Sequence, residues 1–304
     1  MEQGAVISPR ELRQSVLLVT LARTESVILR HGTRNTLSTP IPVMSPFETL
    51  LTTITDGVLT ITLNRPEVFN AFNERMKQEL NAAFREAERD EAVRCIVLRG
   101  AGAKAFCSGQ DLKEHAGTKR SLKESLDQSY NPLIRKIRTM EKPVIGMING
   151  VAAGAGCSLA LACDMRVMAT TARLIEVFVR IGLVPDSGSH WFLPRLVGMA
   201  RAFEYAATGR DISAEEAERV GLVNRIAPPD ELEGVTMELA RSMARGPSRA
   251  IGLIKRTLNR AATLDLDALL DYEASVQELA AGTGDHAEGV KAFLEKRPPE
   301  YKGR

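Results

Sequence analysis

Short apolar runs alternate with small-residue loops and amphipathic helices from residue 49 to about residue 228. The runs CIVLRG, PVIGMI and DMRVMAT are typical of buried strands, and the Asp56–Gly57 pair between two earlier runs predicts a β-hairpin. Asn73 precedes a segment whose apolar residues recur at helical spacing: Met76, Leu80, Ala83, Phe84 and Ala87. This alternation predicts an α/β fold with largely parallel strands, whose loops gather at one end.

After about residue 229 the pattern changes to helices alone. Several amphipathic segments follow one another there, and together they carry much apolar surface. Such surface packs either on a core of its own or on a neighbouring copy of the chain. We therefore expect an α/β core over residues 44–228 and a C-terminal helical oligomerisation region over residues 229–304.

The first 43 residues differ from the rest of the chain. Their charged residues are mainly arginine, Ser and Thr are frequent, and the segment ends in the turn-like TPIPV. An Arg-rich, acid-poor composition is compatible with an organelle transit peptide. We favour a poorly ordered extension, with the compact protein beginning near Met44, because SVLLVTLA is only a short apolar stretch.

The bulk composition excludes several classes of partner and site. A net charge of +2 lacks the strong positive character of a nucleic-acid-binding protein, and 44% hydrophobic residues are ordinary for a globular chain. No apolar run reaches the roughly 18–20 residues that span a membrane. The four cysteines lack metal-ligand spacing, so we expect no metal site and a reducing, cytoplasmic location.

Two glycine-rich loops each follow a predicted strand: GAGAKAFCSGQDLKE at residues 100–114 and NGVAAGAGCSLALACD at residues 149–164. Such turns let backbone N–H groups approach a ligand, and the second loop opens a helix whose N-terminus adds positive potential. One interpretation is a pair of backbone donors that converge on a developing oxyanion. The other is a pair of tight turns that let helices pack on a sheet. Each loop by itself leaves both interpretations open.

Six segments taken together favour one of these two interpretations of the glycine-rich loops. In chain order they are ITLNRPEVFNAFN (61–73), AFCSGQDLKE (105–114), NGVAAGAGCSLALACD (149–164), GLVPDSG (182–188), LPRLVG (193–198) and FLEKRPPEY (293–301). Over roughly residues 48–304 the chain resembles the crotonase, or enoyl-CoA hydratase/isomerase, superfamily. The resemblance implies a spiral of strand–strand–helix turns, a C-terminal trimerisation region, and a homotrimer or a dimer of trimers. It also implies an acyl-CoA thioester substrate whose enolate the protein stabilises.

Carried over position by position, the resemblance places the oxyanion hole at the backbone N–H groups of Gln110 and Ala155. Contacts to coenzyme A are expected near Lys104, Lys113 and Lys296, and the last of these can serve a neighbouring subunit. For each lysine, a solvated surface role stays open. No separate cofactor is implied, because coenzyme A is part of the substrate.

The residues at the positions where the family carries its catalytic acids favour an isomerase. Hydratases of the family use two glutamates, whose positions fall on Ser158 and Phe178 in this chain. Hydration needs a base for the water and an acid for the carbon, so the absence of both carboxylates disfavours it. Asp186 stands where family isomerases carry a catalytic acid, and one carboxylate can both remove and return a proton.

The segment GLVPDSGSHWFLPRLVG is similar in particular to the 1,2-epoxyphenylacetyl-CoA isomerases and other single-aspartate isomerases. We therefore expect an acyl-CoA isomerase that shifts a double bond or rearranges an epoxide, with Asp186 as general base and acid. Two alternatives stay open. One is an enoyl-CoA hydratase or dehydratase, and the other is a homologue that binds CoA esters without turning them over.

Further expectations concern the surroundings of Asp186. Apolar neighbours would raise the pKa of its carboxyl, and the same residue can alternatively cap a helix opening at SGSHWFLP. Glu176 lies two residues from a vacant hydratase position, and a solvent-facing or ion-paired side chain is favoured there over a displaced acid. Three residues are predicted to line the acyl pocket: Phe178, Trp191 and Ser158.

Overall fold

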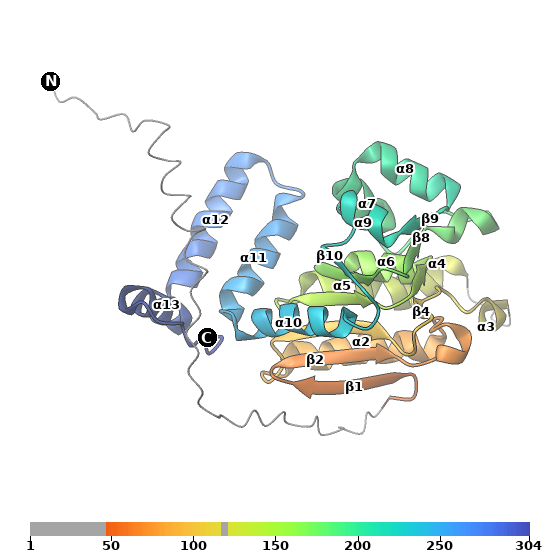
Figure 1. Ribbon diagram of the computed structural model, residues 1–304. Helices are drawn as coiled ribbons and strands as arrows, with labels where there is room; N and C mark the ends of the chain where they lie inside the picture. The colour runs from red at the N-terminus through yellow and green to blue at the C-terminus, as the bar shows by residue number, and fades with distance from the viewer. Residues whose placement is uncertain (1–46, 117–120) are drawn as a thin grey trace. The chain divides into compact units, whose positions relative to one another are not determined.

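The computed structural model of the protein describes residues 47–116 and 121–304. The predicted extension over residues 1–43 lies outside these ranges. The described residues confirm the predicted α/β fold, in which two sheets are surrounded by helices and helices alone follow the last strand (Figure 1). None of the helices that these residues form is long and apolar enough to cross a membrane.

The larger sheet is parallel except for its first strand. The hairpin prediction is confirmed, since Asp56 and Gly57 have the positive φ angles, +53° and +76°, that a tight two-residue turn requires. The remaining neighbours pair in parallel. In spatial order the strands are β1 (Leu50–Thr55), β2 (Val58–Leu63), β3 (Cys95–Gly100), β5 (Val144–Ile148), β7 (Met165–Ala169) and β10 (Arg225–Ala227).

The other strands form a smaller, four-stranded sheet. In spatial order they are β4 (Ala105–Cys107), β6 (Val151–Ala153), β8 (Arg173–Ile175) and β9 (Asp211–Ser213). The first three each follow directly on a strand of the larger sheet, namely β3, β5 and β7. The chain therefore passes through both sheets in each repeat, which is the predicted spiral of strand–strand–helix turns.

The first long helix, α2 (Glu74–Arg89), forms as its sequence pattern predicts. The side-chain oxygen of Asn73 accepts a hydrogen bond from the Met76 N–H at 2.8 Å and so satisfies one free donor of the first turn. All five apolar residues of the predicted face are buried. The helix covers one side of the larger sheet, where it contacts β1 and β2.

Shorter helices connect the other strands. Between β4 and β5 the chain forms α4 (Leu122–Ser125), the wider η2 turn (Leu126–Tyr130) and α5 (Asn131–Thr139). The remaining connections are η1 (Pro66–Val68), α3 (Leu112–Ala116), α6 (Ala155–Ala162), η3 (Val177–Ile181), α7 (Ser189–Val197), α8 (Met199–Thr208) and α9 (Ala214–Arg219).

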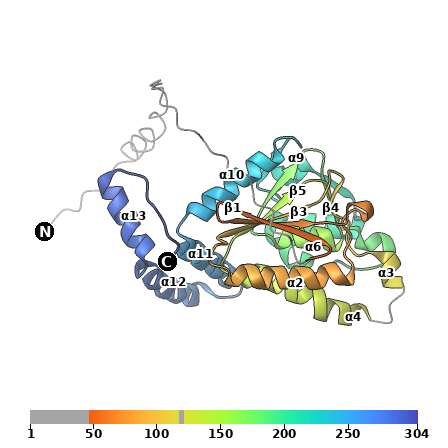
Figure 2. The ribbon, with the colours of Figure 1, turned by 90° about the horizontal axis from the view of Figure 1, so that it is seen from below.

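Four helices end the chain: α10 (Leu232–Arg245), α11 (Ser248–Ala261), α12 (Leu266–Ala281) and α13 (Gly284–Glu295). α10 packs on the larger sheet, on the opposite side from α2 (Figure 2). α12 buries none of its side chains, and Phe293 and Leu294 of α13 are 83% and 74% exposed. Such exposed apolar surface suits the expected oligomerisation region, although oligomerisation itself stays a prediction.

Candidate active site

A tight turn after β4 carries Gln110. Gly109 in this turn has φ +95°, a left-handed conformation that glycine adopts without strain. Phe72 clamps the turn, because its N–H donates to the Gly109 carbonyl at 2.7 Å and its carbonyl accepts from the Asp111 N–H at 2.9 Å. The Gln110 side chain is held as well, since Tyr130 Oη donates to its Oε1 at 2.6 Å. Both the backbone around Gln110 and its side chain are thus fixed.

A second tight turn leads from β6 into α6. Gly154 has φ +53°, and its N–H donates to the carbonyl of Ile175 at 2.9 Å. α6 begins at the next residue, Ala155, so the unpaired N–H groups of its first turn lie here. Gly156 presses against β4: a methyl group on it would lie 2.1 Å from the carbonyl oxygen of Cys107. Only a residue without a side chain permits this approach.

These two turns lie against each other. A methyl group on Gly109 would lie 3.5 Å from the backbone nitrogen of Ala155 and 2.9 Å from the carbonyl oxygen of Ala153. Within residues 47–116 and 121–304, the N–H groups of Gln110 and Ala155 donate to no protein acceptor. Two unused backbone donors on adjacent turns, one of them at a helix N-terminus, can bind an anionic oxygen.

A third turn, Pro185–Gly188, brings a carboxyl group to α6. Ser187 holds a positive φ of +51°, and the hydroxyl of Ser158 in α6 lies 3.1 Å from the backbone carbonyl oxygen of Asp186. The Asp186 side chain is half-buried. Burial raises the pKa of its carboxyl, as expected, against the opposing effects of a 2.8 Å hydrogen bond from Ser187 and the charge of His190.

The interpretation of Asp186 as a helix cap is wrong. α7 begins after Gly188, and no side chain accepts a hydrogen bond from its first turn. The backbone carbonyl of Asp186, not its carboxylate, accepts from the Ser189 N–H at 3.0 Å. The carboxylate is consequently engaged by the Ser187 hydroxyl alone among the hydrogen-bond donors of the described residues, which leaves it able to meet a ligand.

Glu176 is completely buried, and the expectation of a solvent-facing or ion-paired side chain was wrong. It lies between β8 and η3, where Ser189 Oγ donates to its Oε1 at 2.9 Å. Burial raises the pKa of its carboxyl to about 7, and the nearby charge of Asp186 acts in the same direction. No cation is among the groups that shift this pKa. Packing by α6 and α7, which lie elsewhere in the sequence, removes the side chain from solvent.

The chain that carries these turns matches a known protein family. The model of the enoyl-CoA hydratase/isomerase family matches residues 53–304. The chain belongs to this family. Membership implies an acyl-CoA thioester as substrate, and it accounts for the way in which the spiral fold brings three separate turns together.

Individual family members agree with this assignment. The chain is 42% identical over 261 residues to 1,2-epoxyphenylacetyl-CoA isomerase of Escherichia coli K12, covering 84% of this chain and 99% of that protein. It is 45% identical over 258 residues to a Rhodobacter capsulatus protein named "Probable enoyl-CoA hydratase", covering 85% and 99%. The crystal structure of an enoyl-CoA hydratase from Bacillus anthracis matches with a TM-score of 0.82 at 35% identity, covering 84% and 100%. Relatives at this level of identity thus carry both hydratase and isomerase names.

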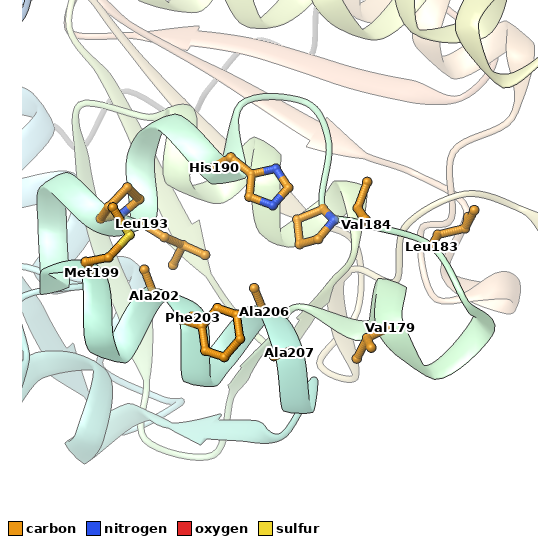
Figure 3. Close-up of a pocket in the computed structure, with 12 residues that line it drawn as sticks. Val179, Leu183, Val184, His190, Leu193, Met199, Ala202, Phe203, Ala206 and Ala207 are labelled. Carbon is orange, nitrogen blue, oxygen red and sulfur yellow. The ribbon is translucent and has the colours of Figure 1, made fainter.

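An apolar groove with a cavity volume of about 470 Å³ opens between η3 and the α7–α8 pair (Figure 3). Pro185 and His190, on either side of Asp186 in the chain, both line it. Most of the other lining side chains are aliphatic, with Met199 and Phe203 contributed by α8. Such a groove can hold the apolar part of a ligand close to the turn that carries Asp186.

The three residues predicted for the acyl pocket lie in different surroundings. The Phe178 ring packs beside the second turn, 3.8 Å from where a methyl group on Gly154 would lie. Ser158 is fully buried in α6, and Trp191 is 38% exposed on α7. None of the three is among the side chains that line the groove, so their role in an acyl pocket stays a prediction.

The lysines predicted to contact coenzyme A are all exposed. Lys104 and Lys113 flank the turn that carries Gln110, whereas Lys296 ends α13 with φ +53°. Both ribbon views place α13 and α3 on opposite sides of the two sheets (Figures 1 and 2). One chain therefore does not bring Lys296 to the Gln110 turn, and its expected contact requires a neighbouring subunit.

Sequence reasoning missed several residues that hold the Gln110 turn. Arg65 donates to the Asp111 carboxylate at 3.0 Å and to the Ala71 carbonyl at 2.7 Å. The Asn70 side chain donates to the Ala101 carbonyl at 3.0 Å. Both residues stand in the 61–73 segment, which served only as part of a family resemblance. The segment also contains Asn64, Glu67 and Asn73, so no sequence signal singled out these two polar side chains.

Glu176 makes folding stability depend on pH. The folded protein keeps the Glu176 proton up to about pH 7, whereas the unfolded chain loses it near the ordinary value of 4.5. The folded state therefore binds more protons between these values, and this contribution to the free energy of unfolding falls as pH rises through that window. The difference in free energy of unfolding between Glu176→Gln and wild type is expected to shift in favour of the variant by roughly 2–3 kcal/mol from about pH 5 to about pH 8. Urea unfolding at the two pH values measures this shift.

Glu79→Gln is the control, because the pKa of Glu79 is shifted downward instead of upward. Glu79 is also buried, but hydrogen bonds from Thr49 and Glu48 and the charge of Arg75 overcome desolvation and lower the pKa of its carboxyl. Its titration lies below the tested range. This variant is expected to be destabilised by similar amounts at both pH values. If Glu176→Gln were also destabilised by similar amounts at both pH values, Glu176 would not be neutral at low pH.

Proposed function

We propose that the protein is an acyl-CoA isomerase in which Asp186 moves a proton while the N–H groups of Gln110 and Ala155 hold the thioester enolate. One observation carries the proposal: two unused backbone donors lie on adjacent turns, and a half-buried carboxyl of raised pKa is joined to the same helix, α6. Proton abstraction next to a carbonyl needs this combination of base and oxyanion stabilisation.

In the proposed reaction, ionised Asp186 takes a proton from the carbon between the thioester carbonyl and a 3,4 double bond. The electron pair delocalises onto the thioester oxygen, where the two N–H groups stabilise the negative charge. The protonated carboxyl then returns the proton to the far end of the conjugated system, which leaves a 2,3 double bond. Because the same proton leaves and returns, neither water nor a separate cofactor is consumed.

Hydration is the alternative within the family, and the carboxyl positions argue against it. Hydratase glutamates are expected at Ser158 and Phe178, and neither residue is an acid. Glu176 supplies no substitute at the substrate, since its side chain is fully buried and its Oε1 accepts from Ser189. A single carboxyl favours proton transfer between two carbons over addition of water.

Substrate binding and assembly complete the proposal. We propose that Lys104 and Lys113 contact the coenzyme A phosphates of the same subunit and that Lys296 serves a neighbouring one. This arrangement requires a trimer or a dimer of trimers, in which the exposed apolar side chains of α12 and α13 would be covered. Size-exclusion chromatography with light scattering tests the assembly, and a monomeric protein would contradict it.

A three-substrate panel tests the activity. Purified protein is assayed with a 3-enoyl-CoA, a 2-enoyl-CoA and 1,2-epoxyphenylacetyl-CoA, the last because a relative bears that name. We expect the double bond of the 3-enoyl ester to shift, and hydration of the 2-enoyl ester to be slower by at least roughly 10²-fold. Rapid hydration without any double-bond shift would overturn the isomerase. Binding of all three esters without turnover would indicate a homologue that only binds them.

A further inference from the structure

Glu176 is a buried acid with no role in the proton transfer described above. Its second oxygen, Oε2, is buried and has no hydrogen-bond partner among the described residues. An ionised carboxylate in this place has the Ser189 hydroxyl and the weak Cys157 thiol as donors but no cation, and desolvation outweighs both donors, whereas a neutral carboxylic acid needs fewer partners. The environment therefore favours the protonated side chain, which can donate as well as accept.

The titratable groups around Glu176 do not offer it a positive partner. The Cys157 thiol of α6 is neutral and a weak donor, whose hydrogen bond lowers the pKa of Glu176, whereas the charge of the Asp186 carboxyl raises it. His190 of α7 acts on Asp186. On η3, the exposed Arg180 is paired instead with Asp211 of β9 at 3.0 Å.

A chain of hydroxyl groups links Glu176 to the Asp186 turn. Ser189 Oγ lies 2.9 Å from Glu176 Oε1 and 2.8 Å from Ser158 Oγ, which in turn lies 3.1 Å from the backbone carbonyl oxygen of Asp186. Each hydroxyl has one hydrogen to donate. When Glu176 is protonated, all three hydrogens can point the same way: from Glu176 to Ser189, from Ser189 to Ser158, and from Ser158 to the Asp186 carbonyl.

Loss of the Glu176 proton changes the directions of these hydrogen bonds. Ser189 must then donate to the carboxylate, and Ser158 has only one hydrogen for Ser189, the Asp186 carbonyl and the carbonyl of Gly154 at 3.3 Å. The hydrogen bond that joins α6 to the Asp186 turn is weakened as a result. Because Ala155 begins α6, this bond also sets the position of the proposed base relative to one oxyanion donor.

We propose that Glu176 is a positioning residue that works in its protonated form, holding the Asp186 turn against α6 through Ser189 and Ser158. The inference rests on the proposed function, since it assigns Glu176 a part in the isomerisation. Asp186 must be ionised to start the reaction and Glu176 must be protonated. The pH profile of kcat is therefore bell-shaped, and its falling limb belongs to Glu176.

The test compares pH profiles of kcat and KM for the full-length protein between about pH 5.5 and about pH 9. In Glu176→Gln the amide nitrogen can donate to Ser189 at every pH, so we expect activity near that of wild type at low pH and no falling limb near pH 7. Ser189→Ala interrupts the chain. It is expected to lower kcat roughly tenfold at all pH values, with KM nearly unchanged and no falling limb near pH 7.

Glu79→Gln is the matched control, because it neutralises a buried glutamate outside the hydroxyl chain and should keep the falling limb. Protein labelled with ¹³C-carboxyl glutamate gives a second readout without turnover. We expect its infrared band of protonated carboxyl to vanish near pH 7 in wild type and to be absent from Glu176→Gln.

The outcomes separate the two proposals. A falling limb that persists in Glu176→Gln, or an infrared band missing from wild type, would overturn the role of Glu176 while the isomerase stands. Wild-type protein that shows the infrared titration but isomerises none of the esters would overturn the proposed function, and the catalytic role of Glu176 with it. A uniform loss of activity in Glu176→Gln, with the limb unchanged, would indicate a purely structural residue.

Discussion

Replacing Asp186 with Asn is expected to lower kcat for double-bond shifting by about 10³-fold, because an amide can neither take nor return the substrate proton. Asn keeps the size of the side chain and can still accept the Ser187 hydroxyl, now 2.8 Å away. Binding of the ester rests on backbone donors and surface lysines, so Kd is expected to change by less than about threefold. Steady-state kinetics and calorimetry with an unreactive CoA thioester measure the two quantities.

Asp211→Asn provides the matched control for this substitution. Asp211 is an exposed aspartate whose carboxylate pairs with Arg180 at 3.0 Å, outside the three turns. Exposed ion pairs contribute little, so its kcat and thermal stability should stay close to those of wild type. Equal losses of ester affinity and of kcat in Asp186→Asn would contradict a catalytic carboxyl and would indicate that the turn itself depends on it.

Gly156→Ala is expected to damage both stability and catalysis. The added methyl group would lie 2.1 Å from the carbonyl oxygen of Cys107, so α6 must move away from β4. Overpacking against backbone is expected to lower the free energy of unfolding by about 3 kcal/mol. Because Ala155 moves with the helix, kcat of the folded protein is expected to fall roughly 10²-fold. Urea unfolding and kinetics at a temperature where the variant is folded measure these effects.

Gly234→Ala is the control for the change from glycine to alanine. Gly234 lies in α10, and a methyl group on it would meet nothing within 4 Å. Alanine there is expected to raise the free energy of unfolding by about 0.5–1 kcal/mol, because it favours the helix. If Gly156→Ala had wild-type stability and kcat, the close approach of α6 to β4 would not position the Ala155 N–H.

The parts of the fold that depend on neighbouring residues were predictable from sequence. The Asp56–Gly57 turn is confirmed, and Asn73 caps α2, because each of these features is decided within a few residues. The order of strands and helices also followed from the hydrophobic pattern. Pro132, which cannot donate a backbone hydrogen bond, stands at the start of α5, where the preceding η2 turn ends.

The candidate site was only partly predictable. Glycine turns can be read as places where backbone donors are accessible, but not as turns that meet, and the contact of Gly109 with Ala155 depends on two loops far apart in the chain. The capping interpretation of Asp186 failed because the turn puts its backbone carbonyl, not its side chain, at the start of α7. That choice depends on backbone geometry around Ser187, which no local pattern specifies.

By itself, then, the sequence determined the succession of strands and helices, the two glycine turns and the presence of one acid at Asp186, since these follow from local propensity and composition. The tertiary structure alone decided which groups lose contact with water. Glu176 differs from an exposed glutamate only because α6 and α7 enclose it, and desolvation by that enclosure raises the pKa of its carboxyl to about 7. Solvation depends on every element packed around a group, so it is set by the fold as a whole.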